Sequence, residues 1–185
     1  MSVIAEAQSA AAASYDPIAR ALHWLTVLLV ATEYAVGVTM PRIHRHTPVG
    51  TLIAVHLALG SGILLLVVLR LAWRLTHRAP PPPLPGWQKC VAAVTHFALY
   101  AALLLTPFAG WATASAHGWS VRAFGVIPLP ALLAHPPHVL PWFWGVHVFL
   151  VWWVLFNLIV LHVVAALYHR IIKRDSILGR MLPGL

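Results

Sequence analysis

Four long apolar runs dominate the chain, and short segments rich in proline or basic residues separate them. An α-helix rises about 1.5 Å per residue, so about 20 apolar residues are enough to cross the ~30 Å hydrocarbon core of a bilayer. Each run reaches that length. The pattern therefore predicts four membrane-spanning helices, at residues 21–40, 50–73, 89–113 and 142–169.

Proline positions indicate where these helices begin and end. Asp16 followed by Pro17 is typical of a helix start, with the aspartate as N-cap and the proline as first helical residue. The proline-rich stretch 79–86 cannot continue a helix, and we interpret it as an extended connector between the second and third spans. Residues 114–141 mix prolines with apolar residues, which predicts an interfacial segment that caps one side of the bundle. Residues 1–14 show no periodicity and are predicted to be a mobile tail before a single domain at 15–185.

Composition supports membrane residence. The chain of 185 residues is 61% hydrophobic and 9% charged, whereas soluble domains are roughly a quarter charged. Cys90 is the only cysteine, so the chain has no disulfide framework and no cysteine-based zinc or iron–sulfur site of its own. No basic region precedes the first apolar residues, which argues against a cleaved secretory signal and for a retained first span.

The net charge of +8 orients the helices. Four spans place both termini on one side of the membrane, and basic residues concentrate on the cytoplasmic side. The side with the termini is predicted to hold Arg20, Arg70, Arg74, Arg78, Lys89, Arg170, Lys173, Arg174 and Arg180, and the other side Arg42, Arg45 and Arg122. We therefore expect an all-α integral membrane four-helix bundle with both termini cytoplasmic. Lipid explains the positive charge better than nucleic acid, and no nucleic-acid partner is expected.

Four of the histidines within the predicted spans fall into two pairs at two depths. His147 and His162 are fifteen residues apart on the last span, which separates them by about 22 Å along the helix. In the predicted orientation His23 and His162 lie near the inner face, and His56 and His147 near the outer face. Six-coordinate haem iron takes one imidazole above the ring and one below. The depths therefore predict two bis-histidine haems, one held by each pair.

Small residues next to these histidines would make room for a porphyrin. Gly60 lies one turn from His56, and Ala165 and Ala166 lie one turn from His162. A buried histidine can instead bond to a backbone carbonyl or a hydroxyl of another helix. Four histidines at matched depths favour the haem pairs over that interpretation. A histidine-rich metal transporter without haem stays open as another class of function.

Three other polar residues within the spans are candidates for a role at these centres. Arg70 lies fourteen residues after His56, at the inner depth, where it is predicted to neutralise a haem propionate or, with equal weight, to reach the lipid headgroups. Glu33 is an acidic residue deep within a span, and it is expected to be protonated, paired with an arginine or engaged in proton transfer. His96 has no evident partner at its depth and is interpreted as a packing or quinone-pocket residue. No catalytic residue is assigned.

Four segments of the sequence carry a resemblance to a known family. They are YDPIARALHW in the first span, VHLALGSGILLLVVLRLAWRL in the second, THFALYAALLLTPFAGW in the third and LHVVAALYHRIIKRDSILGRMLP in the fourth and its tail. The chain resembles the bacterial cytochrome b561 family, four-helix membrane proteins with two b haems, from Tyr15 to Pro183. The resemblance implies that the haem ligands are His23, His56, His147 and His162.

The spacing on the last span departs from that family, whose two histidines are typically fourteen residues apart rather than fifteen. One extra residue turns a side chain by about 100° around a regular helix. Either a one-residue bulge absorbs the insertion, as is frequent at functional sites, or the outer ligand is not His147.

Function follows from two such haems. Bis-histidine iron has no open position, which favours electron transfer over oxygen binding. The resemblance implies a superoxide:ubiquinone oxidoreductase, which passes electrons from periplasmic superoxide through both haems to ubiquinone. Arg42, Arg45 and Arg122 would then attract the superoxide anion. The alternative is a haem b subunit that relays electrons between a partner dehydrogenase or hydrogenase and quinone. The sequence leaves the electron donor, the quinone site and the oligomeric state open.

Overall fold

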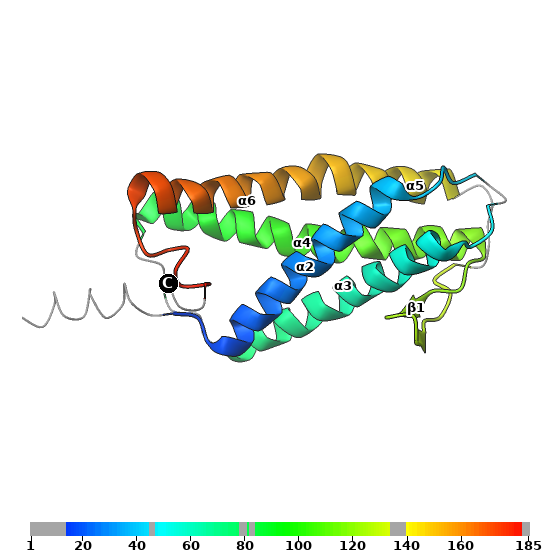
Figure 1. Cartoon of the computed structure of the whole chain (residues 1–185), viewed down its shortest axis with the longest axis horizontal. Helices are drawn as coiled ribbons and strands as arrows, with labels where there is room; N and C mark the ends of the chain where they lie inside the picture. Colours follow the sequence, from blue (N-terminus) through cyan, green and yellow to red (C-terminus); the bar gives the residue numbers. More distant parts are fainter. Residues whose placement is uncertain (1–13, 45–46, 78–80, 82–83, 134–139, 183–185) are drawn as a thin grey trace, which may run out of the picture.

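Four long helices form the structure, a computed structural model that describes residues 14–44, 47–77, 81, 84–133 and 140–182. The first three are α2 (Pro17–Thr39), α3 (Thr51–Thr76) and α4 (Gly86–His117). The fourth is continuous but changes its winding, from α5 (Leu140–Phe149) through π-helical η1 (Leu150–Leu155) and α6 (Phe156–Tyr168) to π-helical η2 (His169–Lys173). All four are long and apolar enough to cross a membrane, so the predicted membrane-spanning bundle is confirmed (Figure 1). The predicted tail, apart from Ser14, and much of the proline-rich connector lie outside the described residues.

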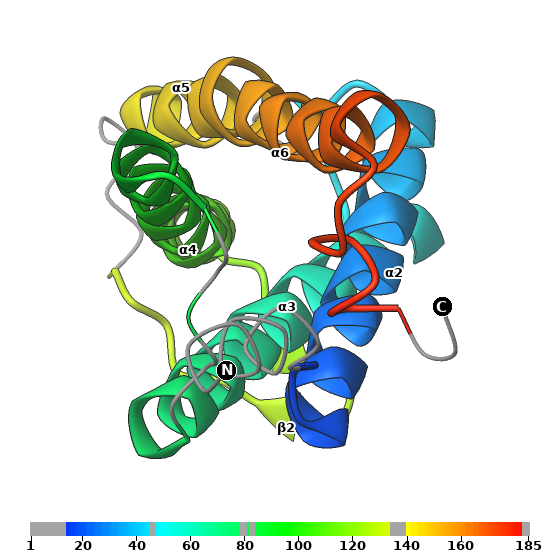
Figure 2. The ribbon, with the colours of Figure 1, turned by 90° about the vertical axis from the view of Figure 1, so that its left-hand side faces the viewer.

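The helices follow one another around the bundle. Contacts join α2 to α3, α3 to α4, and α4 to α5, η1 and α6, and Figure 2 shows this order from one end. The backbone N–H of Tyr15 donates to the carbonyl of Arg180 at 3.1 Å, so the two ends of the described chain meet at the same end of the bundle. That this end is cytoplasmic stays a prediction from the charge pattern.

The start of α2 follows the sequence signal. Asp16 Oδ1 accepts the backbone N–H of Ala19 at 2.9 Å, and this hydrogen bond is the main reason that the pKa of Asp16 lies below its usual value. The Trp73 indole N–H also donates to the Asp16 carboxylate, at 3.2 Å. The cap therefore ties the beginning of α2 to the end of α3.

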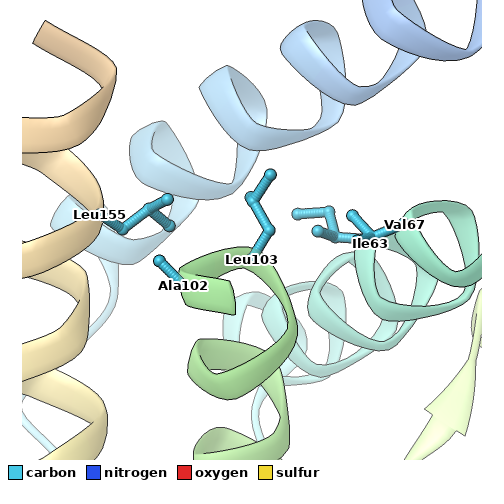
Figure 3. Packing of buried hydrophobic residues seen from close by; sticks show 5 residues of the cluster. All are labelled: Ile63, Val67, Ala102, Leu103 and Leu155. Atoms are coloured by element: carbon cyan, nitrogen blue, oxygen red, sulfur yellow. The ribbon is translucent and has the colours of Figure 1, made fainter. Parts of the chain in front are cut away.

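A small apolar cluster lies where α3, α4 and the fourth helix meet. Its fully buried members are Ile63, Val67, Ala102, Leu103 and Leu155 (Figure 3). Many other apolar side chains on the spans face outward. An apolar exterior is stable in lipid, so the helices need only this limited core.

A two-stranded hairpin that the sequence did not predict follows α4. Strand β1 (Arg122–Ala123) pairs antiparallel with β2 (Ile127–Pro128), and the turn places Phe124 at φ 52° and Gly125 at φ 75°. Positive φ at both central residues gives the turn twist that short hairpins prefer. Glycine adopts it freely, whereas phenylalanine is strained there.

The hairpin docks on α3 rather than across the end of the bundle. Ser61 Oγ donates to the Arg122 carbonyl at 3.2 Å, and the Phe124 ring lies against the backbone of Gly62. Both contact residues on α3 lie more than two turns beyond its start at Thr51. The hairpin therefore folds back along the helix, as Figure 1 shows, and the backbone strain at Phe124 is offset by this contact.

Replacing Gly62 by alanine should detach the hairpin. An added Cβ would come within 2.6 Å of Phe124 Cε1, so the ring must move. We expect Gly62→Ala to cost about 1–3 kcal/mol, as overpacking does, and to lower the thermal unfolding temperature of the purified protein in detergent. Gly145→Ala is the control, because a Cβ there meets nothing within 4 Å. An equal loss in both variants would contradict this packing role.

Candidate haem centres

Two histidines from different helices face each other in the half of the bundle away from the described termini; following the predicted orientation we call this half outer and the other half inner. The rings of His56 on α3 and His147 on α5 have their centroids 6.1 Å apart, with an angle of 85° between the planes. Imidazole nitrogens bind metal ions at about 2 Å, so a metal ion between two imidazoles places the ring centroids about 6 Å apart. The observed separation is the one that two axial ligands of one iron require.

Both rings line a large cavity with mostly apolar walls. The cavity has a volume of about 190 Å³. Gly37, Gly60 and Gly110 are among the lining residues. The apolar walls and the two facing imidazoles fit a haem.

The backbone of α4 orients His147. Its Nδ1 lies 2.9 Å from the carbonyl oxygen of Thr106, so the ring N–H at Nδ1 donates to that carbonyl. Such a bond leaves the lone pair of Nε2 free for a metal ion. Gly110 makes the close approach possible, because a Cβ there would come within 3.0 Å of His147 Cε1.

Glu33 orients the other ring of this pair. The Glu33 Oε1 atom lies 3.0 Å from His56 Nδ1. The ring N–H of His56 does not point at this oxygen, so the contact is close but is not a hydrogen bond. The other carboxylate oxygen, Oε2, is buried without a hydrogen-bond partner among the described residues. Of the three alternatives for Glu33, the structure therefore does not have the pairing with an arginine. A carboxylate beside the second nitrogen of a ligand histidine is a recurrent arrangement at metal sites.

Three histidines gather in the inner half of the bundle. The rings of His23 on α2 and His162 on α6 lie 6.4 Å apart at 70°, again close to the separation that a shared iron needs. His96 on α4 lies on the other side, 5.4 Å from the His162 ring. The expectation that His96 has no partner at its depth was wrong, because depth alone does not show which helix lies next to α6. No three histidine, cysteine or acidic groups in the described ranges are close enough to hold a bare metal ion.

Arg70 belongs to the inner cluster. Its Nη2 lies 2.9 Å from His23 Nδ1, and its guanidinium carbon lies 5.3 Å from the centre of the Tyr100 ring. The side chain therefore points at the cluster rather than at the lipid headgroups. An arginine only donates, so this bond places the proton of a neutral His23 on Nε2. Metal binding at Nε2 requires Arg70 to take another acceptor.

The winding of the fourth helix explains the spacing of its histidines. The π-helical η1 lies between His147 and His162. A π segment holds one more residue than the α-helical turn that it replaces. The bulge predicted as one way to absorb the insertion is therefore present, and both rings face partners on neighbouring helices.

Two polar side chains that the sequence reading overlooked stabilise this π segment. Tyr34 donates its hydroxyl to the carbonyl of Val151 at 2.8 Å, and Asn157 Nδ2 donates to the carbonyls of Trp152 and Trp153 at 3.0 and 3.1 Å. The signal that could have found them is a polar residue in a lipid-facing span, which needs a partner.

The fold defines a multi-pass membrane protein, and its histidines form clusters at two levels of the bundle. Residues 14–184 match the model of the prokaryotic cytochrome b561 family, and the chain belongs to this family. It is a membrane electron-transfer protein, and its family implies haem b as the cofactor.

Curated relatives cover nearly the full chain. Cytochrome b561 homolog 2 of Escherichia coli (strain K12) is 30% identical over 177 residues, which is 91% of this chain and 90% of the relative. Cytochrome b561 homolog 1 of the same organism is 30% identical over 176 residues, covering 88% and 93%. The probable superoxide oxidase CybB of Yersinia pestis is 27% identical over 175 residues, covering 91% and 96%.

Deleting Trp153 should be tolerated. Trp153 lies in η1, and its side chain is 72% exposed, so its loss removes little packing. With one residue fewer, the π segment can become α-helical while the helical segments on both sides keep their rotation about the helix axis. We expect near-native helicity by circular dichroism and a near-native unfolding temperature. Deleting the exposed Val68 from the regular helix α3 is the control, because it turns the rest of that helix by about 100°. Equal damage from both deletions would argue against the π segment.

Proposed function

We propose that the protein carries electrons across the bacterial inner membrane through two b haems, one held by His56 and His147 and the other by His23 and His162. The observation that supports this most is that two histidine pairs, at two levels of one bundle, each have the ring separation that a shared iron needs. Bis-histidine haem supplies reversible one-electron oxidation and reduction without an open coordination position.

The surrounding residues orient the ligands and limit access of water. The Thr106 carbonyl holds the His147 ring through Nδ1, and the Glu33 carboxylate lies 3.0 Å from Nδ1 of His56, so each Nε2 would be free to bind the haem. The apolar walls keep water away from the centre. At the inner centre, the Arg70 guanidinium would neutralise a haem propionate after its hydrogen bond to His23 breaks.

The electron donor in this proposal is superoxide, and the acceptor is ubiquinone. Two superoxide anions each give up one electron and become dioxygen, and ubiquinone takes up the two electrons with two protons to become ubiquinol. The likeness to a probable superoxide oxidase supports the donor. Arg42 and Arg122, both exposed and both at the end opposite the described termini, supply positive charge that attracts the anion. Arg45 lies outside the described residues.

The proposal is tested in two steps with purified protein. A pyridine haemochrome assay should give two b haems per chain, and fewer would overturn the ligand assignment. Superoxide supplied together with ubiquinone should then reduce the haems rapidly and form ubiquinol, above the level of a haem-free control. Two haems without this reduction would favour the subunit alternative, and co-purification of a larger redox partner would support it.

Gly110→Ala should remove the outer haem selectively. The added Cβ pushes the His147 ring from the Thr106 carbonyl, so we expect the haem content to fall from two towards one per chain. Gly37→Ala is the matched control in the same cavity, because its Cβ would meet His56 Cε1 at an ordinary 3.9 Å. Unchanged haem content in Gly110→Ala would argue against His147 as a ligand.

A further inference from the structure

The two histidine clusters differ in the charge of the group beside them. A carboxylate oxygen of Glu33 lies 3.0 Å from His56 in the outer cluster, and the guanidinium of Arg70 lies 2.9 Å from His23 in the inner cluster. Glu33 and Arg70 are both largely shielded from solvent, with 16% of the Glu33 side chain exposed. Charges at such sites are screened far less than charges in water.

Each charge is close to one centre and far from the other. Glu33 follows His23 by ten residues along α2, about 15 Å of helix, and Arg70 follows His56 by fourteen residues along α3, about 21 Å. Each charge therefore acts mainly on the centre beside it.

The sign of each effect follows from electrostatics. Oxidation of a haem adds one positive charge, which a nearby carboxylate stabilises and a nearby guanidinium destabilises. A carboxylate beside Nδ1 also makes the ligand imidazole a stronger donor to the metal. Glu33 therefore lowers the reduction potential of the outer centre, and Arg70 raises that of the inner centre.

We propose that Glu33, ionised beside His56, and Arg70 set the direction of electron transfer, from the outer centre down in energy to the inner one. This inference rests on the proposed function, because it needs a haem in each cluster. The transferred electron oxidises the outer centre and reduces the inner centre, and no bond forms or breaks. When His23 binds the haem through Nε2, its Nδ1 carries the proton and can no longer accept a hydrogen bond from Arg70. The Arg70 side chain must then donate to another acceptor. Because Arg70 is fixed on α3, its charge still lies beside the inner centre.

Potentiometric titration of the two haems tests the roles of Glu33 and Arg70 as positioning residues. Glu33→Gln keeps the shape and removes the carboxylate, and we expect the potential of the outer centre to rise while that of the inner centre stays. Arg70→Gln should lower the inner potential and leave the outer one. Either change reduces the equilibrium constant for electron transfer from the outer to the inner centre. A tenfold reduction of that constant corresponds to a change of about 59 mV in the difference between the two potentials.

Matched controls separate these local effects from general changes of charge. Arg74→Gln removes an exposed positive charge one turn beyond Arg70, and Thr32→Ala removes a hydroxyl that donates to the Leu28 carbonyl beside Glu33. Both should leave the two potentials unchanged. The Gly110→Ala variant, in which we expect only the inner haem to remain, shows which of the two measured potentials belongs to the inner centre.

The outcomes distinguish this inference from the proposed function. Fewer than two haems in the unmodified protein would contradict the proposed function, whereas two haems with unmoved potentials in Glu33→Gln and Arg70→Gln would overturn only the inference. If Glu33→Gln loses the outer haem, Glu33→Asp keeps a carboxylate on a shorter side chain. A higher outer potential in Glu33→Asp then supports the inference, and an unchanged one overturns it.

Discussion

An imidazole inside a bilayer has no water to bond, and this constraint shapes most of the bundle. Each in-membrane histidine needs a partner from another helix. The structure places a carbonyl against His147, a carboxylate beside His56, a guanidinium beside His23 and the edge of another imidazole against His162. The helices can bring these partners close because small residues such as Gly110 leave the necessary space. Packing and polar satisfaction therefore reinforce each other at both levels of the bundle.

The fourth helix is common to both levels, so its winding couples them. Its π segment turns His147 and His162 towards partners on different helices, and the carbonyl groups of that segment bond to Tyr34 and Asn157. Tyr34 lies next to Glu33 on α2. One short stretch of α2 therefore contacts both the irregular part of the fourth helix and the outer histidine of α3.

The sequence predicted the four spans to within a few residues of most of their ends, because apolar length directly reflects bilayer thickness. It also predicted which histidines meet, since a residue's depth follows from the helix rise. Depth leaves open the rotation of each helix about its axis and the order of helices around the bundle. The neighbours of His96 and Glu33 depend on that order and rotation, which is why they emerged only from the structure. The hairpin was missed because its two-residue strands are too short to show an alternating pattern.

The hairpin gives α3 an environment that the other spans lack. The hairpin covers Ser61 and Gly62 on α3. In the most apolar stretch of α3, 28% of the residues are buried inside the protein, against 6–17% in the other three spans. Lipid molecules next to a membrane protein exchange continually, and a span in contact with them follows their motion. Protein neighbours on several sides hold α3 in place. Helix α3, which carries His56 near one face of the membrane and Arg70 near the other, is therefore the span most enclosed by protein. The other three helices are more exposed to lipid.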